Sequence, residues 1–301
     1  MVESLYLVAD VGGTNCRLAL ADANGVRTDT INRFQNQKYA SFSDIVRVFL
    51  CDKPKTNAAV VAIAGPVDSG CGQLTNWDWY FNAEDLAHDL LLDKVYLLND
   101  LEALGYAVSV LPKSSLRCLS GSPNDNEFQA IVMGLGTGFN ISLACNSSNT
   151  VFAAEMGHAA LPQPVVTIIH NAVGEVHAFE TVEHLFSGRG LAKLHEIRTG
   201  SFCKPEDVAN SKNGSQTLTI MACALGALVR EVAYLYLPEN GIYFNGSLAH
   251  TLLSEATTEF VLEPLKVDDR FGGRMARIPI CILTDDISAL YGCAHYISLQ
   301  S

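Results

Sequence analysis

The sequence predicts an α/β fold, and three observations support that prediction. Apolar runs of strand length alternate along the chain with segments whose apolar residues recur at helical spacing. The 301 residues are 49% hydrophobic, which is enough to fill a substantial core. A strand, a glycine-rich turn and a return strand open the chain, and this pattern restarts near Gly134. The repetition suggests an internal duplication, with two related halves whose glycine turns face each other across a cleft.

The first third of the chain reads as a meander that passes into alternating strands and helices. The expected strands are residues 5–9, 17–22, 58–65 and 94–100, and the expected helices are residues 41–50 and 101–111. Ser41 or Ser43 caps the first helix, and Pro112 breaks the second. Asp100 therefore lies where a strand ends and a helix begins, at the edge where open α/β sheets place their ligands.

The rest of the chain repeats the alternation. An apolar strand at residues 130–134 runs into the turn 134–140, and residues 141–145 form the return strand. A long helix is expected at residues 215–237, capped by Ser215 and stopped by Pro238. The last expected elements are strands at residues 241–247 and 278–284 and an amphipathic helix at residues 286–299.

Charge and cysteine content narrow the class of protein. The formal net charge of −12 repels nucleic acid and anionic membranes, so the expected partner is a small molecule. The nine cysteines are scattered and form no C-x-x-C pair, and we expect reduced thiols in a cytoplasmic protein. The N-terminus has no basic region, and the apolar stretch "LTIMACALGALV" is shorter than the roughly 20 residues that a bilayer needs. Secretion and membrane insertion are therefore not expected.

The stretch "DVGGTN" carries more than a reversal of the chain requires. Gly12 and Gly13 let the backbone approach a ligand closely, and Thr14 and Asn15 add short polar side chains. Backbone N–H groups in such a turn form a concave site for phosphate oxygens, and Asp10 can hold Mg²⁺ beside it, directly or through water. A plain β-turn is the alternative for this motif taken alone.

A second glycine turn strengthens the phosphate interpretation. Gly136, Thr137 and Gly138 follow an apolar strand, as the first turn does. No G-x-x-x-x-G-K-[ST] motif occurs, and no G-x-G-x-x-G follows a strand. The pattern is thus unlike that of P-loop NTPases and of Rossmann dehydrogenases.

Asp100 is the candidate general base. Phosphoryl transfer to an alcohol needs a carboxylate that orients the hydroxyl and accepts its proton. Asn99 and Asp100 could instead form only a helix cap, which is what such a pair does most often.

Three further segments carry candidate ligand groups, each with a simpler alternative. Glu155 and His158 in "EMGH" could aim at one ligand, could form a surface turn, or could bind a metal, although "EMGH" lacks neighbouring cysteine or histidine ligands for that. Glu183 stands on a short helical stretch, where a carboxylate usually faces solvent. Gly246 in "FNGS" would let adenosine lie close to the backbone, or would simply join a strand to a helix.

Together these stretches resemble the bacterial glucokinase family, in the same order and over essentially the whole chain. The matching segments are "LVADVGGTNCRLAL", "TNWDW", "LLNDLEALGYA", "GLGTGFN", "EMGHAALP", "EHLFSGRGL" and "IPICILTDDISALYGCAHYI". The family belongs to the hexokinase and actin-like ATPase superfamily. The resemblance implies two ribonuclease-H-like α/β domains flanking an active-site cleft, a smaller one of residues 1–111 plus 286–301 and a larger one of residues 112–285.

The resemblance also implies an activity and a set of site residues. The activity is phosphorylation of a hexose at its 6-hydroxyl by ATP with Mg²⁺, most simply of glucose, with Asp100 as the catalytic base. The hexose contacts that it implies are Asn76, Asn99, Asp100, Glu155, His158 and Glu183. The nucleotide contacts that it implies are Asp10, Gly12, Gly13, Thr14, Asn15, Gly136, Thr137, Gly138 and Gly246. A homodimer is the family-level expectation for assembly.

The chain departs from the family pattern at a few positions. Asn140 and Ser247 stand where the family usually has glycine, and Met156 stands where a glycine is usual in the sugar motif. No cysteine follows "GHAALPQPVV" until Cys203, so we expect a member without the structural zinc of a related group. A kinase for another hexose, a catalytically weak sugar-binding sensor and an actin-like filament ATPase remain as alternatives.

Overall fold

The computed structural model describes residues 4–123, 128–174, 177–267 and 270–300. Residues 1–3, on which the expectation about the N-terminus partly rests, lie outside these ranges. The chain divides into two compact units, each described here by itself. Unit 1 comprises Met1–Ser115, Asn149–Val151 and Asp285–Ser301, and unit 2 comprises Leu116–Ser148 and Phe152–Thr284.

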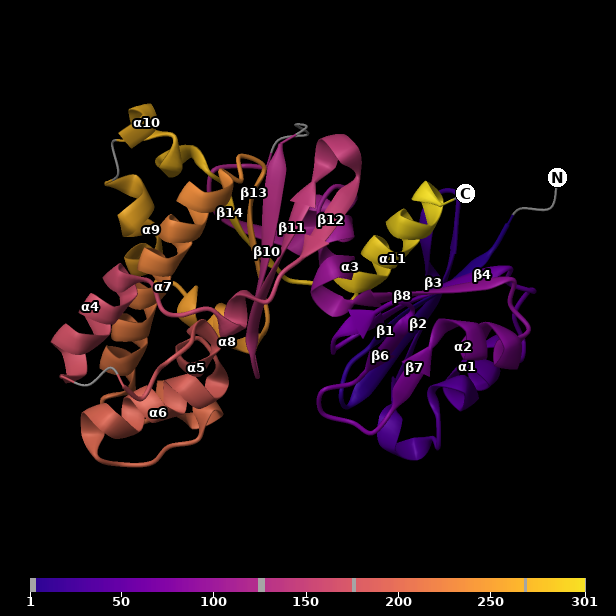
Figure 1. The fold of residues 1–301 in the computed structure, drawn as a ribbon, viewed down its shortest axis with the longest axis horizontal. Helices are drawn as coiled ribbons and strands as arrows, with labels where there is room; N and C mark the ends of the chain where they lie inside the picture. The colour runs from indigo at the N-terminus through magenta and orange to yellow at the C-terminus, as the bar shows by residue number, and fades with distance from the viewer. Residues whose placement is uncertain (1–3, 124–127, 175–176, 268–269, 301) are drawn as a thin grey trace. The chain divides into compact units, whose positions relative to one another are not determined.

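Unit 1 is built on a five-stranded sheet of order β3-β2-β1-β4-β8, seen with its helices in Figure 1. β1 pairs antiparallel with β2 and parallel with β4. The strands are β1 (Tyr6–Val11), β2 (Asn15–Asp22), β3 (Gly25–Gln35), β4 (Ala58–Ile63) and β8 (Lys94–Asn99). A small second sheet contains β5 (Val67–Asp68), β6 (Cys71–Gln73) and β7 (Tyr80–Asn82).

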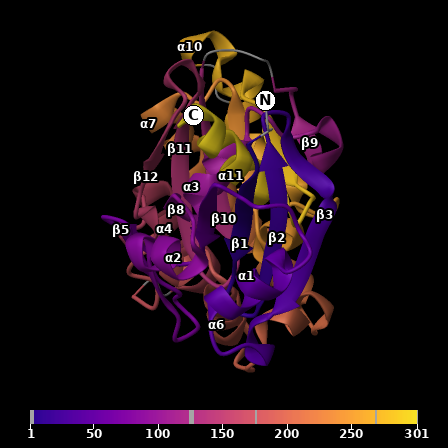
Figure 2. The same ribbon diagram turned by 90° about the vertical axis from the view of Figure 1, so that its right-hand side faces the viewer.

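Helices cover both faces of the larger sheet, as a second view also shows (Figure 2). α1 (Phe42–Leu50) and α2 (Ala83–Leu90) pack on the face that Leu7 and Ala9 present. α11 (Ser288–Leu299) packs on β1 and β4 from the other side, next to α3 (Asp100–Ala107). The two helices approach so closely that a Cβ added at Gly292 would lie 1.7 Å from the Ala103 carbonyl oxygen.

The caps of two helices agree with the sequence. The Ser41 hydroxyl accepts a hydrogen bond from Asp44 N and so caps α1, as one of the two expected serines. Asn99 caps α3, and the Glu102 side chain accepts from Asn99 N in return, which completes a capping box. α3 ends at Ala107, short of the predicted Leu111, because the chain turns before Pro112 is reached.

Unit 2 is built on a six-stranded sheet of order β12-β11-β10-β13-β14-β9. The strands are β9 (Leu116–Ser120), β10 (Gln129–Leu135), β11 (Phe139–Cys145), β12 (Thr150–Ala153), β13 (Gly241–Asn245) and β14 (Ile280–Leu283). The first two residues of β12 are counted with unit 1, although the strand belongs to this sheet. Its helices are α4 (Gln163–Val173), α5 (Val182–Leu185), α6 (Gly188–Thr199), α7 (Gly214–Tyr236), α8 (Ser247–Leu252), α9 (Thr258–Lys266) and α10 (Arg270–Gly273). α7 packs against α4, α6 and α9, and its apolar residues join those of β10 and β13 in one core.

The two sheets share one topology, which agrees with the expected duplication. In each, the first strand pairs antiparallel with its hairpin partner and parallel with the strand that follows a helix. The order β3-β2-β1-β4-β8 of unit 1 matches β12-β11-β10-β13-β14 of unit 2, which has β9 as an additional edge strand.

The long helix begins and ends one residue before its predicted bounds, and its cap differs from the prediction. α7 begins at Gly214 after Asn213, whose backbone is left-handed, and Asn213 makes no side-chain cap, so the expected Ser215 cap is wrong. The helix has 23 residues, because less apolar turns at both ends extend the apolar stretch at residues 218–229. Among the described residues it alone is long and apolar enough to cross a bilayer. However, 61% of its most apolar window is buried inside the protein, as in the core helix of a soluble protein.

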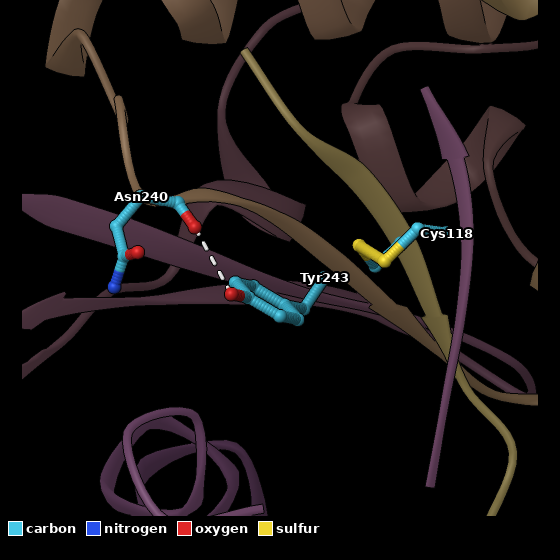
Figure 3. Close-up of a disulfide and its surroundings, with 4 residues drawn as sticks. Cys118, Asn240 and Tyr243 are labelled. Carbon is cyan, nitrogen blue, oxygen red and sulfur yellow. Dashed lines mark hydrogen bonds between the residues drawn. A yellow bond between two sulfur atoms is a disulfide. The ribbon is translucent and has the colours of Figure 1, made fainter. Parts of the chain in front are cut away.

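The expectation that every cysteine is a reduced thiol is wrong for one pair. Cys118 on β9 and Cys281 on β14 are directly opposite in the antiparallel register, and they form a disulfide. Figure 3 shows this bond near Tyr243, whose hydroxyl donates to the Asn240 carbonyl. The two cysteines are 163 residues apart, so only the strand pairing brings them together.

Candidate active site

The carboxylate at the end of β1 is held by an ion-pair network in unit 1. Arg17, directly opposite Asp10 on β2, donates from Nη1 to Asp10 Oδ2 at 3.1 Å. The same arginine donates from Nε to Asp286 at 3.0 Å, and Arg33 donates to Asp286 at 2.8 Å. These two arginines lower the pKa of Asp286 to about 2, so it stays ionised. Arg17 is thereby fixed beside Asp10.

The first glycine turn follows Asp10 and is held from two sides. Gly12 N donates to the Asn15 carbonyl at 3.0 Å, which closes the turn. The Asn36 side chain donates to the Gly12 carbonyl at 2.8 Å, and Asn36 N donates to the Thr14 carbonyl. A Cβ added at Gly13 would lie 3.3 Å from the Asn76 Cβ. The structure thus brings a proposed hexose contact, Asn76, against the proposed phosphate turn.

Asp100 lies at the start of α3, as predicted from the sequence. Its Oδ1 accepts from Leu101 N at 2.9 Å. Burial first, and then the negative charge of Asp10, raise the pKa of Asp100 to about 6 against the lowering effect of the Leu101 hydrogen bond. Asn99 acts as the helix cap, accepting from Leu101 N, and its Nδ2 donates to the Gly65 carbonyl at 2.9 Å. Asp100 therefore has the ionisation of a general base near neutral pH.

The second glycine turn lies in unit 2 and is closed like the first. Gly136 N donates to the Gly138 carbonyl at 3.0 Å, and Gly188 N donates to the Gly136 carbonyl at 2.9 Å. Thr137 is exposed at the tip of the turn. Gly246 has a φ of +105°, and a Cβ there would lie 2.2 Å from the Leu135 carbonyl oxygen. Glycine is therefore required at residue 246, which the structure places directly beside the phosphate turn.

Glu183 ties the second turn to α5 and α6. Its Oε2 accepts from Phe139 N at 3.1 Å, and its Oε1 pairs with Arg189 at 3.2 Å. A Cβ added at Gly138 would lie 2.5 Å from Glu183 Oε2. Glu183 is thus not the simple solvated carboxylate that its short helix suggests, because both of its oxygens contact groups of unit 2.

The "EMGH" segment forms a 3₁₀ turn, Met156–His158, after Glu155. Gly157 is buried, and a Cβ there would lie 2.2 Å from the Phe139 carbonyl oxygen, so this turn packs tightly against the start of β11. The side chains of Glu155 and His158 are exposed by 70% and 78% and lie 4.0 Å apart. Asn140 Nδ2 donates to Glu155 Oε2 at 3.1 Å.

Each unit therefore gathers part of the predicted set. Unit 1 holds Asp10, Gly12, Gly13, Thr14, Asn15, Asn76, Asn99 and Asp100, and unit 2 holds Gly136, Thr137, Gly138, Glu155, His158, Glu183 and Gly246. The sequence reading missed Arg17, Asn36, Arg189 and Asp286. Hairpin register was the signal for Arg17, since a tight turn after Val11 sets residue 17 opposite residue 10. The contacts of Asn36 and Asp286 had no local signal.

The residues beside the first turn fit Mg²⁺. Mg²⁺ is usually held by one or two carboxylates together with phosphate oxygens and water. Asp10 offers such a carboxylate, half-buried at the end of β1, and only its Oδ2 is engaged by Arg17. Among the described residues, no group of three or more His, Cys, Asp or Glu side chains could hold a metal without help from a ligand.

The fold and these two turns define a sugar kinase with the actin-like ATPase fold. The sequence model of the glucokinase family matches residues 7–300. The chain belongs to the glucokinase family, as its resemblance predicted, and it is an enzyme that phosphorylates a sugar.

Individual relatives cover the chain almost completely. It is 26% identical to the glucokinase of Brucella melitensis over 98% of this chain and 91% of that protein. A solved glucokinase from an Antarctic psychrotroph superposes with a TM-score of 0.85 at 24% identity, over 99% of both chains. A ROK family glucokinase from Streptomyces griseus, solved with glucose and AMPPNP, gives a TM-score of 0.62 at 18% identity, over 99% of this chain and 100% of that one.

Proposed function

We propose that this enzyme transfers the γ-phosphoryl group of ATP to the 6-hydroxyl of glucose, with Asp100 as the general base. The observation that carries the proposal is the position of Asp100, at the start of α3 and next to the charge of Asp10, with its pKa raised to about 6. An aspartate in that range is ionised at neutral pH and still accepts a proton readily. The Streptomyces griseus enzyme, solved with glucose and an ATP analogue, supports the choice of both substrates.

The proposed reaction needs no covalent intermediate. Asp100 takes the proton of the 6-hydroxyl while that oxygen attacks the γ-phosphorus in line, and the bond from the γ-phosphorus to the bridging oxygen breaks to release ADP. Asp10 would hold Mg²⁺, which offsets negative charge on the phosphates when it is bound. The glycine turns 12–14 and 136–138 would bind phosphate oxygens through their backbone N–H groups.

The remaining candidates would hold the sugar. Asn76 and Asn99 of unit 1, and Glu155, His158 and Glu183 of unit 2, supply the paired donors and acceptors that hydroxyl-rich ligands need. A sugar that lacks a matching hydroxyl would leave some of these groups unsatisfied. Asn140 and Ser247 are not among the residues with positive φ, so replacing the usual glycines causes no backbone strain at either position.

The test is release of ADP from Mg-ATP by the purified protein, with glucose, other hexoses and N-acetylhexosamines supplied one at a time. We expect turnover with glucose, and a loss in kcat of about 10²- to 10⁴-fold in the Asp100→Asn variant, because general-base catalysis has that size. Turnover of the variant within about tenfold of the parent would show that Asp100 is not the base. Silence with every sugar, together with intact sugar binding, would instead support the sensor alternative.

A further inference from the structure

Asn140 makes contacts that its counterpart in a glycine-containing relative could not make. It lies on β11 opposite Gly134 of β10, and Gly134 has no side chain to meet it. The Asn140 amide instead reaches the "EMGH" turn. Its Nδ2 donates to Glu155 Oε2 at 3.1 Å, and its Oδ1 accepts from Met156 N at 3.0 Å. One side chain thus holds both the carboxylate and the backbone of that turn.

The first of these hydrogen bonds restrains the Glu155 carboxylate, and the second restrains the backbone next to it. The Glu155 side chain is 70% exposed, so little packing restrains it. Ordering a long, exposed carboxylate side chain costs conformational entropy. Asn140 supplies that order before a ligand arrives, because it engages Oε2 and leaves Oε1 to accept from a ligand hydroxyl. Pre-organisation of this kind raises affinity without adding a contact to the ligand.

Asn140 also lies between the proposed phosphate-binding turn of unit 2 and its proposed sugar contacts. The preceding residue, Phe139, donates its N–H to Glu183 at 3.1 Å, and its carbonyl packs against Gly157. The Asn140 side chain extends this link to Glu155. The second phosphate turn, Glu183 and Glu155 are therefore joined through two consecutive residues of β11.

We propose that Asn140 is a positioning residue that sets hexose specificity by holding Glu155 in one orientation. This inference rests on the proposed function, in which Glu155 contacts the sugar. A carboxylate in a fixed place accepts from a hydroxyl at a fixed place, and it penalises a sugar in which that hydroxyl is absent, inverted or replaced by an N-acetyl group. A mobile carboxylate would follow the sugar and would discriminate less.

The experiment is a double-mutant cycle on sugar binding, with Asn140→Ala, Glu155→Ala and the double variant. Isothermal titration with glucose and with N-acetylglucosamine, without nucleotide, gives the Kd values. We expect Asn140→Ala to weaken glucose binding about five- to tenfold, within the usual net contribution of one hydrogen bond. We expect the preference for glucose over N-acetylglucosamine to fall. In the Glu155→Ala background, Asn140→Ala should have no further effect, since it acts through Glu155.

Further measurements separate this role from a purely structural one. The KM for ATP should stay within about twofold in Asn140→Ala, because the second turn keeps its Glu183 and Gly188 contacts. Asn140→Asp places a second carboxylate against Glu155 and should weaken glucose binding more than alanine does. Gln129→Ala, at the other end of β10, is the matched control and should change neither sugar affinity nor preference. Asn140→Gly, the residue usual in the family, replaces the alanine variant if that does not fold.

The outcomes that overturn the proposal are distinct from those that overturn the proposed function. Equal weakening by Asn140→Ala in the parent and in Glu155→Ala would show that Asn140 does not act through Glu155. Weakening that is the same for both sugars would show that it sets no specificity. If the parent protein binds no hexose, both the proposed function and this role are wrong. If the parent binds glucose and Asn140→Ala binds it equally well, only this role is wrong.

Discussion

The β1–β2 and β10–β11 hairpins occupy equivalent places in the two sheets. They carry different side chains at one matched pair of cross-strand positions. The antiparallel register sets Arg17 opposite Asp10 in the β1–β2 hairpin, and it sets Asn140 opposite Gly134 in the β10–β11 hairpin. The first pair is an ion pair that continues to Asp286 near the C-terminus. The second pair has no cross-strand side-chain contact, because Gly134 has no side chain, and Asn140 turns to Glu155 instead.

This difference shows how a duplicated fold can divide the work of one reaction. A half-buried carboxylate beside an arginine suits a cation and its phosphates, and its charge also raises the pKa of Asp100 in the same unit. A neutral amide that donates a hydrogen bond to a neighbouring carboxylate can hold that carboxylate in place for a hydroxyl-rich ligand. We infer that Asp10 and Arg17 of the first hairpin serve the chemical step and that Asn140 of the second hairpin serves sugar recognition, and the predictions below test that division.

The largest effect is expected from Asp10→Asn. The change removes the proposed carboxylate ligand of Mg²⁺ and the partner of Arg17, and we expect kcat to fall about 10²- to 10³-fold, which corresponds to several kcal/mol of lost charge stabilisation. The measurement is kcat as a function of Mg²⁺ concentration, with Mg²⁺ binding followed separately by calorimetry. Asp22→Asn is the matched control, since Asp22 pairs with Arg27 beside the β2–β3 turn, away from the first glycine turn. A kcat for Asp10→Asn close to that of the control would contradict the division of roles between the two hairpins.

A smaller effect is expected in the pH profile. The base must be ionised, and the pKa of Asp100 is raised to about 6, so kcat/KM should be flat above that pH and fall tenfold per unit below it. Asp10→Asn removes a negative charge near Asp100, which lowers its pKa, and the acid limb should then move to lower pH. Asp22→Asn should leave the limb in place. A limb already near pH 4 in the parent, or a move to higher pH in Asp10→Asn, would contradict this account.

The sequence could predict a large share of the fold because strand and glycine-turn patterns are local. The ends of β1, β8 and β10 fall within a few residues of their predicted places, and Asp100 stands at the predicted strand–helix junction. Contacts made by distant segments carried no such signal. The Asp286 contact with Arg17 spans 269 residues, and the Cys118–Cys281 disulfide depends on the pairing of β9 with β14. Asn140 was visible as a departure from the family, but its partners depend on how the "EMGH" turn folds back on β11.

The smallest effect concerns two glycines in the second turn. Gly138→Ala places a Cβ 2.5 Å from Glu183 Oε2, which must move and so weakens its hydrogen bond with Phe139 N. We expect the hexose KM to rise about three- to tenfold, because the hydrogen bond with Phe139 N is weakened and not lost, and this lies within the usual net contribution of one hydrogen bond. Gly136→Ala should leave the hexose KM unchanged whatever it does to the KM for ATP, since nothing lies within 4 Å of a Cβ there.

Backbone strain does not complicate this pair, because neither glycine is among those with positive φ. The only intended difference between the variants is therefore the contact with Glu183. An equal rise of the hexose KM in both would mean that the turn itself, and not Glu183, limits sugar binding. A rise confined to Gly138→Ala would link the second turn to the sugar through one carboxylate, which is the role that the comparison of the two hairpins assigns to unit 2.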